Sequence, residues 1–142
     1  MEIFRIKLKE TTPKRVLVAD DDPVMRRLLS AMLTQREHES VVAKDGREAY
    51  RILQTDSRFS AAIFDMTMPF LEGLDLIRYM KSERRLMKIP IMMISAGQDL
   101  KLMTSSFAAG ATAFLPKPFT PDQLQSAIRM LLGHMSANKK VA

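Results

Sequence analysis

Five residues have side chains suited to binding and transferring a charged group, and each ends or directly follows a short apolar run: Asp20, Asp21, Asp65, Ser95 and Lys117. Carboxylates brought to one place repel each other, by roughly 4 kcal/mol for a pair about 4 Å apart at an effective dielectric near 20. Two kinds of cation could offset this repulsion: the ammonium group of Lys117, or a hard divalent ion with oxygen ligands such as Mg²⁺. Neither His nor Cys is among these residues, which argues against zinc.

Asp65 ends the apolar run Ala61 to Phe64, and Pro69 and Gly73 then shape the loop before the next helix. A carboxylate at a strand end faces a ligand rather than a core; the alternative is a residue that only caps the following helix. A metal ion, a lysine and a small hydroxyl around one carboxylate suit phosphoryl transfer, in which catalysis is mostly positioning and charge neutralisation. We therefore predict that Asp65 is a nucleophile that forms an acyl phosphate.

Short apolar strands and amphipathic helices alternate along the chain from about Lys14. We expect strands at 15–19, 41–43, 61–64, 89–94 and 113–115. Caps and turn signals favour helix starts at Asp22-Pro23, Asp45-Gly46, Gly73, about Asp99 and Thr120. Five strand and helix pairs predict an α/β fold, with a parallel sheet covered by helices on both faces. Such sheets bind ligands beyond the carboxyl ends of their strands, so the five side chains are expected at one edge of the sheet.

The composition narrows the class of protein. A chain of 142 residues, 46% of them hydrophobic, fits one domain with a sizeable core. The net charge of +6 could suggest an acidic partner, but no helix-turn-helix or aromatic stacking set is visible, so direct nucleic-acid binding is not expected. There is no cysteine, no signal peptide and no apolar run near the roughly 18 residues of a membrane span. We expect a soluble, cytoplasmic protein without a membrane span.

Four motifs of the segment 14–133 resemble a response-regulator receiver domain of the CheY-like family, in that family's order and spacing. They are VLVADDDPVMRRLL, the acid of FDMTMPFLEG, the hydroxyl of MMISA and the lysine of AFLPKPF. The resemblance implies a flavodoxin-like fold: a doubly wound (βα)5 three-layer sandwich with a five-stranded parallel sheet in the order 2-1-3-4-5. It also divides the chain into an N-terminal arm (1–13), a receiver domain (14–133) and a C-terminal tail (134–142).

The same resemblance implies roles around the acidic residues. Asp65 would be the phosphoacceptor. Asp20 and Asp21 would be the acidic pair that holds Mg²⁺, or Mn²⁺, together with Asp65 and the backbone carbonyl of Thr67.

Further roles follow from the resemblance on the last two strands. Ser95 and Lys117 would contact the phosphoryl oxygens, and the Lys117-Pro118 bond would be cis. Phe114 occupies the position of an aromatic residue that changes rotamer on activation. The family often has tyrosine there, and phenylalanine can swing but cannot make the hydrogen bond of a tyrosine hydroxyl.

The function so implied is a phosphorylation-dependent switch of a two-component phosphorelay rather than an enzyme, with at most Mg²⁺-dependent self-phosphorylation and self-dephosphorylation. A histidine kinase or phosphotransfer protein would donate the phosphoryl group. The output surface would be the helix at 99–109, the strand at 113–115 and the last helix, and it would bind an unknown protein target or a second copy of the chain.

Two alternatives stay open at this point. A haloacid-dehalogenase-type phosphatase would also use Asp65 as nucleophile, but it needs a second aspartate two residues later, where Thr67 stands. The arm alternates apolar Phe4, Ile6 and Leu8 with basic residues, so it could instead carry the signal by adding a strand to a partner or a second copy. Only nine residues follow the receiver segment, too few for an output domain, so the chain acts through partners or is a fragment.

Overall fold

A computed structural model describes residues 13–97 and 100–141, with side chains as far as Gly133. It contains strands and helices with the bounds β1 Arg15–Ala19, α2 Pro23–Gln35, β2 Glu39–Ala43, α3 Gly46–Thr55, β3 Ala61–Asp65, α4 Gly73–Ser82, β4 Ile91–Ala96, α5 Leu100–Ala109, β5 Ala113–Lys117 and α6 Pro121–Val141. The five strands form one parallel sheet in the order β2-β1-β3-β4-β5, which confirms the predicted fold class.

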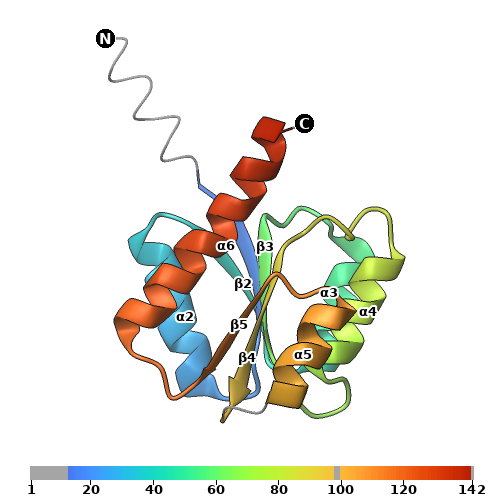
Figure 1. Cartoon of the computed structure of the whole chain (residues 1–142), viewed down its shortest axis with the longest axis horizontal. Coiled ribbons are helices and arrows are strands. Elements are labelled where there is room, and N and C mark those ends of the chain that lie inside the picture. The colour runs from blue at the N-terminus through green and yellow to red at the C-terminus, as the bar shows by residue number, and fades with distance from the viewer. Residues whose placement is uncertain (1–12, 98–99, 142) are drawn as a thin grey trace.

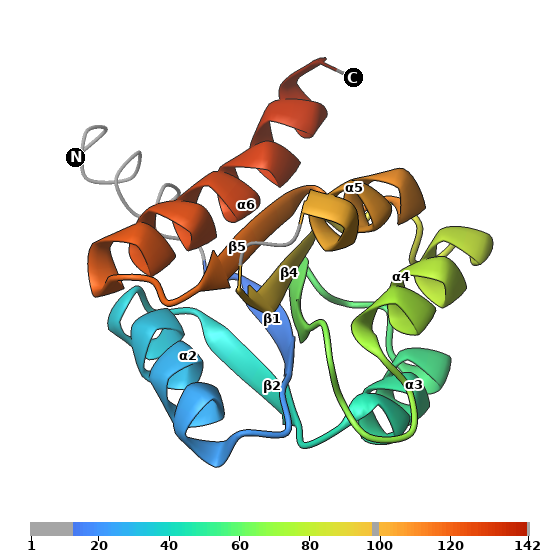
Figure 2. The ribbon, with the colours of Figure 1, turned by 60° about the horizontal axis from the view of Figure 1, so that its bottom comes forward.

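Helices cover both faces of this sheet. Helices α2 and α6 lie on one face, and α3, α4 and α5 lie on the other (Figure 1 and Figure 2). Successive residues of a strand point to opposite faces, so each strand contributes to two core layers. In β1, Val16 and Val18 pack under α2 and α6, whereas Leu17 packs on the side of α3 and α4. The three-layer sandwich follows from apolar strands that are buried on both faces.

Local hydrogen bonds confirm several of the predicted helix boundaries. The Val24 N–H donates to Asp22 Oδ1 at 2.9 Å, so Asp22 caps α2. At the start of α6 the Gln123 N–H donates to Thr120 Oγ1 at 3.1 Å, and the Thr120 N–H donates to the Gln123 side chain at 2.9 Å. Gly110, with φ 120°, follows the end of α5 in a conformation that favours glycine.

Some strand ends differ from the expected ones. Strand β2 begins at Glu39, two residues early, because the Glu39 carboxylate pairs with the Arg15 guanidinium at 3.0 Å on the neighbouring strand. Strand β5 continues to Lys117 through Pro116. A proline is tolerated there because β5 is an edge strand and its missing N–H breaks no ladder on the open side.

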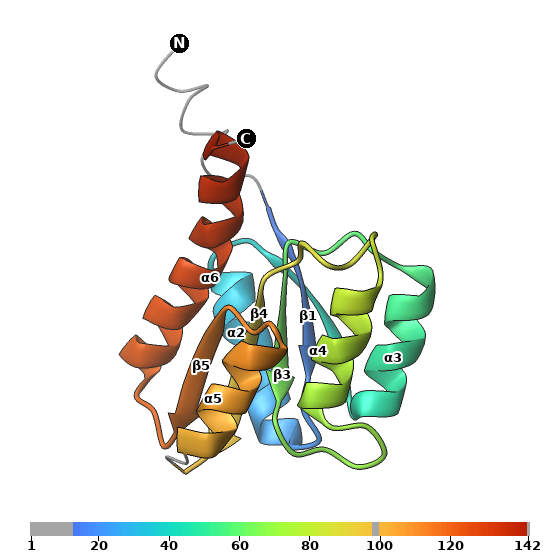
Figure 3. The ribbon, with the colours of Figure 1, turned by 45° about the vertical axis from the view of Figure 1, so that its right-hand side comes forward.

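The last helix is long. Helix α6 continues to Val141, so residues 134–141, expected as a tail, are helical, and α6 extends beyond the rest of the domain near the start of β1 (Figure 3). The predictions for the arm concern residues that lie outside the described part of the chain, except Pro13. None of the helices within the described residues combines the length and apolar character that crossing a membrane requires.

Candidate functional site

The predicted site residues lie at one edge of the sheet, where the carboxyl ends of the strands meet (lower edge in Figure 1). Asp20 and Asp21 directly follow β1, and Asp65 is the last residue of β3. On the next two strands, Ser95 lies near the end of β4 and Lys117 is the last residue of β5. The parallel register therefore brings carboxylates from two strands next to a hydroxyl and an ammonium group from the two others.

Three carboxylates form a cluster at this edge. Asp20, Asp21 and Asp65 each offer an oxygen, and these oxygens lie within 4.8 Å of one another. Asp20 is 1% exposed and Asp65 is 8% exposed, whereas Asp21 is exposed. Asp20 Oδ1 accepts the Asp22 N–H at 2.8 Å, but the buried Asp20 Oδ2 has no hydrogen-bond partner among the described residues. A buried, unpartnered carboxylate oxygen in an all-oxygen cluster fits a hard divalent cation such as Mg²⁺ or Mn²⁺.

Burial and mutual repulsion make the cluster hard to ionise fully. Burial and the charge of Asp20 raise the pKa of Asp65 to about 7, although Lys117 and the Thr67 N–H oppose this rise. Burial also raises the pKa of Asp20, against the opposing effects of the Asp22 N–H and Lys117. A cation bound between the carboxylates would favour their ionised forms.

The loop after Asp65 is closed by backbone contacts. The Gly73 N–H donates to the Met66 carbonyl at 3.1 Å. A Cβ on Gly73 would lie 2.7 Å from the Asp65 carbonyl oxygen, so only glycine permits α4 to start this close to β3. Thr67 lies in this loop and is exposed, and its N–H points to Asp65 Oδ1 at 3.5 Å.

Ser95 and Lys117 approach the cluster differently. Ser95 is 2% exposed, and among the described residues its hydroxyl contacts the Ala96 carbonyl, at a long distance of 3.4 Å. Lys117 is half-buried, and its carbonyl accepts the Gly97 N–H at 3.2 Å. None of the ion pairs between described residues involves Lys117, so its charge acts on Asp65 from a distance. The Lys117-Pro118 bond is cis.

Phe114 lies under α5. It is half-buried and packs against the core layer shared with α3 and α4, as do Leu102 and Ala109 of α5. Phe114 pairs with Met93 on β4, and Pro116, two residues later, pairs with Ser95. A change in the position of the Phe114 ring would therefore act on the side chains of α5.

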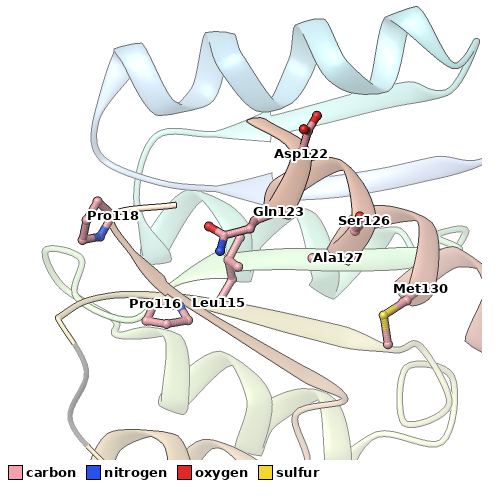
Figure 4. A pocket seen from close by; sticks show the side chains of 8 residues that line it. All are labelled: Leu115, Pro116, Pro118, Asp122, Gln123, Ser126, Ala127 and Met130. Carbon is pink, nitrogen blue, oxygen red and sulfur yellow. The ribbon is translucent and has the colours of Figure 1, made fainter. Parts of the chain in front are cut away.

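A groove runs along the outer side of β5, between that strand and α6 (Figure 4). Its volume is about 450 Å³, and it is lined by Leu115, Pro116, Pro118, Asp122, Gln123, Ser126, Ala127 and Met130. The Met130 side chain is 74% exposed, so this part of α6 offers apolar surface next to the edge strand.

One contact at the site was not expected from the sequence. Arg26 Nη1, from the first turns of α2, donates to the Asp20 carbonyl at 2.8 Å. A signal was available, because a cation close to the N-terminus of a helix is at the unfavourable end of the helix dipole and needs another partner. Arg26 thus fixes the backbone that carries the acidic pair.

Comparison with known proteins agrees with this geometry. The family model of the response regulator receiver domain matches residues 16–129. The chemotaxis protein CheY1 of Helicobacter pylori is 33% identical over 120 residues, which cover 84% of this chain and 97% of that protein. The response regulator MprA of Mycolicibacterium vanbaalenii is 35% identical over 84% of this chain, a segment that covers 51% of that protein.

Solved structures agree as well. The chemotaxis response regulator CheY4 of Vibrio cholerae superposes with a TM-score of 0.79 and 30% identity, over 84% of this chain and 99% of that one. A CheY-like receiver domain protein from Methanospirillum hungatei gives a TM-score of 0.80 and 25% identity, over 89% of this chain and 99% of that one. The chain therefore belongs to the family of CheY-like response regulator receiver domains.

Proposed function

We propose that this chain is a phosphorylation-dependent switch in which Asp65 accepts a phosphoryl group. The observation that carries the proposal is the cluster of Asp20, Asp21 and Asp65, which each offer a carboxylate oxygen within 4.8 Å of the others. The buried Asp20 Oδ2 also has no hydrogen-bond partner among the described residues. Response regulators interact with histidine kinases and downstream targets, so the donor would be a histidine kinase or a phosphotransfer protein. The haloacid-dehalogenase-type alternative lacks support, because Thr67 stands where its second acid is needed.

The transfer is a substitution at phosphorus. An Asp65 carboxylate oxygen attacks the phosphorus of a phosphohistidine, the new O–P bond gives an acyl phosphate, and the P–N bond breaks with its electron pair going to the histidine nitrogen. Attack requires the ionised carboxylate, which Lys117 favours and burial disfavours. When bound, Mg²⁺ would be held by Asp20, Asp21, Asp65 and the Thr67 carbonyl and would neutralise charge on the phosphoryl oxygens.

Ser95 and Lys117 are assigned to the phosphoryl oxygens. The contact of the Ser95 hydroxyl to the Ala96 carbonyl is long, at 3.4 Å, so little is lost from this contact when the hydroxyl turns to a phosphoryl oxygen. Movement of the segment after Ser95 would open room under α5, into which Phe114 could turn. Coupling of this kind is typically about 1 to 3 kcal/mol, which shifts a two-state equilibrium without refolding the domain.

The surface affected is proposed to be α5, β5 and α6. It carries exposed apolar side chains, Leu100 and Phe107 on α5 and Met130 on α6, and it includes the groove beside β5. A downstream protein or a second copy of the chain would bind there. We keep the domain division that the family implies: an N-terminal arm, a receiver domain at 14–133 and a C-terminal segment after it.

Phosphorylation by acetyl phosphate tests the assignment. Wild-type protein incubated with acetyl phosphate and Mg²⁺ should gain one phosphoryl group by intact-mass spectrometry, and Asp65→Asn should gain none. Asp22→Asn is the matched control, because asparagine also caps a helix and Asp22 lies outside the cluster. EDTA should abolish labelling, and Asp21→Ala should reduce it. Equal labelling of the Asp65→Asn protein would refute the proposal.

A further inference from the structure

The loop that follows the phosphoacceptor contains a strained turn at Phe70. The Leu71 N–H donates to the Pro69 carbonyl at 2.9 Å, and Phe70 between them has φ 72°. A hydrogen bond between residues two apart, around a residue with positive φ, defines the rare and strained form of γ-turn. A bulky aromatic residue in this region is an outlier, and such strain persists only where the surroundings hold it in place.

Two contacts from the start of α3 hold this turn. The guanidinium carbon of Arg47 lies 3.7 Å from the centre of the Phe70 ring. Next to it, a Cβ on Gly46 would collide with the Leu71 carbonyl oxygen, so the two backbones touch and glycine is required. Figure 3 shows the loop after β3 reaching the N-terminal end of α3.

Neither core packing nor helix electrostatics explains why Phe70 and Arg47 are there. The Phe70 side chain is 67% exposed, so it is not a core residue. Arg47 lies in the first turn of α3, where the helix dipole disfavours a cation. Their stacking is the interaction that these two positions share.

The strained turn belongs to the loop that carries the candidate cation ligands. The loop leaves Asp65, passes through Thr67 and is closed by the hydrogen bond from the Gly73 N–H to the Met66 carbonyl. Its base is fixed by Gly73 against the Asp65 carbonyl, and its tip is fixed by α3. A change at the tip is therefore transmitted to Asp65 and Thr67 through a short, closed segment of backbone.

We propose that Gly46, Arg47, Phe70 and Leu71 form a latch that positions the Asp65 to Thr67 segment for a divalent cation. Arg47 and Phe70 are positioning residues, since they act on the ligands through the backbone. The proposal rests on the proposed function for the identity of the site, but the latch itself has a readout that needs no metal.

The test uses the full chain with Phe70→Ala, and Phe70→Tyr as the conservative variant. Arg51→Ala is the matched control, an exposed arginine one turn further along α3. Amide hydrogen exchange of Leu71 and Gly73 is measured by NMR without metal, and the Mg²⁺ dissociation constant is measured by calorimetry without a phosphodonor. Because Phe70 is exposed, its replacement by alanine should leave the fold intact.

We expect Phe70→Ala to speed exchange at both amides and to weaken Mg²⁺ binding, each by about two- to fivefold, the range of one exposed cation–π contact. Phe70→Tyr and Arg51→Ala should match the wild type. Gly46→Ala should produce both changes more strongly, because the added Cβ displaces Leu71.

Unchanged exchange in Phe70→Ala would overturn the latch. Faster exchange with unchanged Mg²⁺ affinity would overturn the positioning role. If the wild type bound no Mg²⁺, the proposed function would fail, whereas the exchange rates of Leu71 and Gly73 would still decide whether the latch exists.

Discussion

The Ser106 hydroxyl lies 3.7 Å from the sulfur of Met66, the residue that follows Asp65. Ser106 is fully buried and is the one buried residue of α5, and its hydroxyl also donates to the Leu102 carbonyl at 2.8 Å. Helix α5 is therefore seated on the sheet through a small side chain in contact with the neighbour of the proposed phosphoacceptor. Since Leu102 and Ala109 of α5 pack against the core but are only partly buried, Ser106 is the most deeply buried contact of this helix.

Replacing Ser106 by leucine should therefore loosen α5. The larger side chain has no space at a fully buried position, and overpacking of this kind costs about 1 to 3 kcal/mol in the free energy of unfolding. Urea unfolding measures the loss, and hydrogen exchange should show it concentrated in α5. Ser105→Leu is the matched control, since Ser105 is exposed on the same helix and should change stability by less than about 0.5 kcal/mol.

The raised pKa of Asp65 makes the stability of the domain depend on pH. The folded state keeps this proton up to about pH 7, whereas the unfolded state loses it near 3.8. The contribution of Asp65 to stability is thus fully present below 3.8 and is lost as pH rises through about 7. Asp65→Asn, which cannot ionise, should be more stable than the wild type at pH 8 by at most about 4 kcal/mol, at about 1.4 kcal/mol per pH unit.

Chemical denaturation at pH 4 and pH 8 checks this expectation. The stability difference between Asp65→Asn and the wild type should shrink towards pH 4. There Asp65 is protonated in the folded wild type and is partly protonated in the unfolded wild type. Mg²⁺ at pH 8 should also reduce it, because a cation stabilises the ionised cluster. A difference that does not vary with pH would show that Asp65 ionises freely in the fold.

A second pH effect is expected far from the site, at His38. The Lys14 N–H donates to His38 Nδ1 at 3.0 Å, which requires an unprotonated nitrogen, and burial together with the nearby Lys14 and Arg36 charges lowers the pKa of His38. The unfolded state then takes up the proton first, so this stabilisation is fully present above about 6.5 and is lost as pH falls through the lower folded pKa. His38→Asn should lose about 1 kcal/mol at pH 8 and little at pH 5, as measured by urea unfolding. An equal loss at both pH values would contradict this assignment.

Much of the fold could be predicted because its signals are local. The caps at Asp22 and Thr120 act on neighbouring residues, and the alternation of apolar runs identified all five strands. The full length of β5 could not be predicted in this way. Pro116 argues against a strand unless the strand lies at an edge, and the edge position is a property of the whole sheet.

The site shows the same division. Asp20 and Asp21 could be predicted as an acidic pair, but the sequence did not show that their burial differs. The fold buries Asp20 and exposes Asp21. The contact between Arg47 and Phe70 joins residues far apart in the chain. It depends on a positive φ at Phe70, which the identity of the residue does not predict. Relationships set by tertiary packing and backbone strain were therefore the ones missed.

Lys117 is expected to couple the phosphoryl group to β5 rather than to support the transfer itself. It is the last residue of β5, its backbone carbonyl accepts the Gly97 N–H, and its charge reaches Asp65 without a direct ion pair. With beryllofluoride as the phosphoryl mimic, hydrogen exchange in the wild type should change between Ser95 and Phe119. In Lys117→Ala these changes should be lost, while acetyl phosphate still labels Asp65.

Lys88→Ala controls for the loss of one positive charge, since Lys88 is exposed and lies before β4, away from the cluster. It should respond to beryllofluoride as the wild type does. If Lys117→Ala kept the full response between Ser95 and Phe119, Lys117 would not couple the phosphoryl group to β5. The coupling would then run through Ser95 and through Met66, which contacts the buried Ser106 of α5. Changes confined to residues 1–12 in the wild type would instead favour the arm as the output element and would end the assignment of α5, β5 and α6.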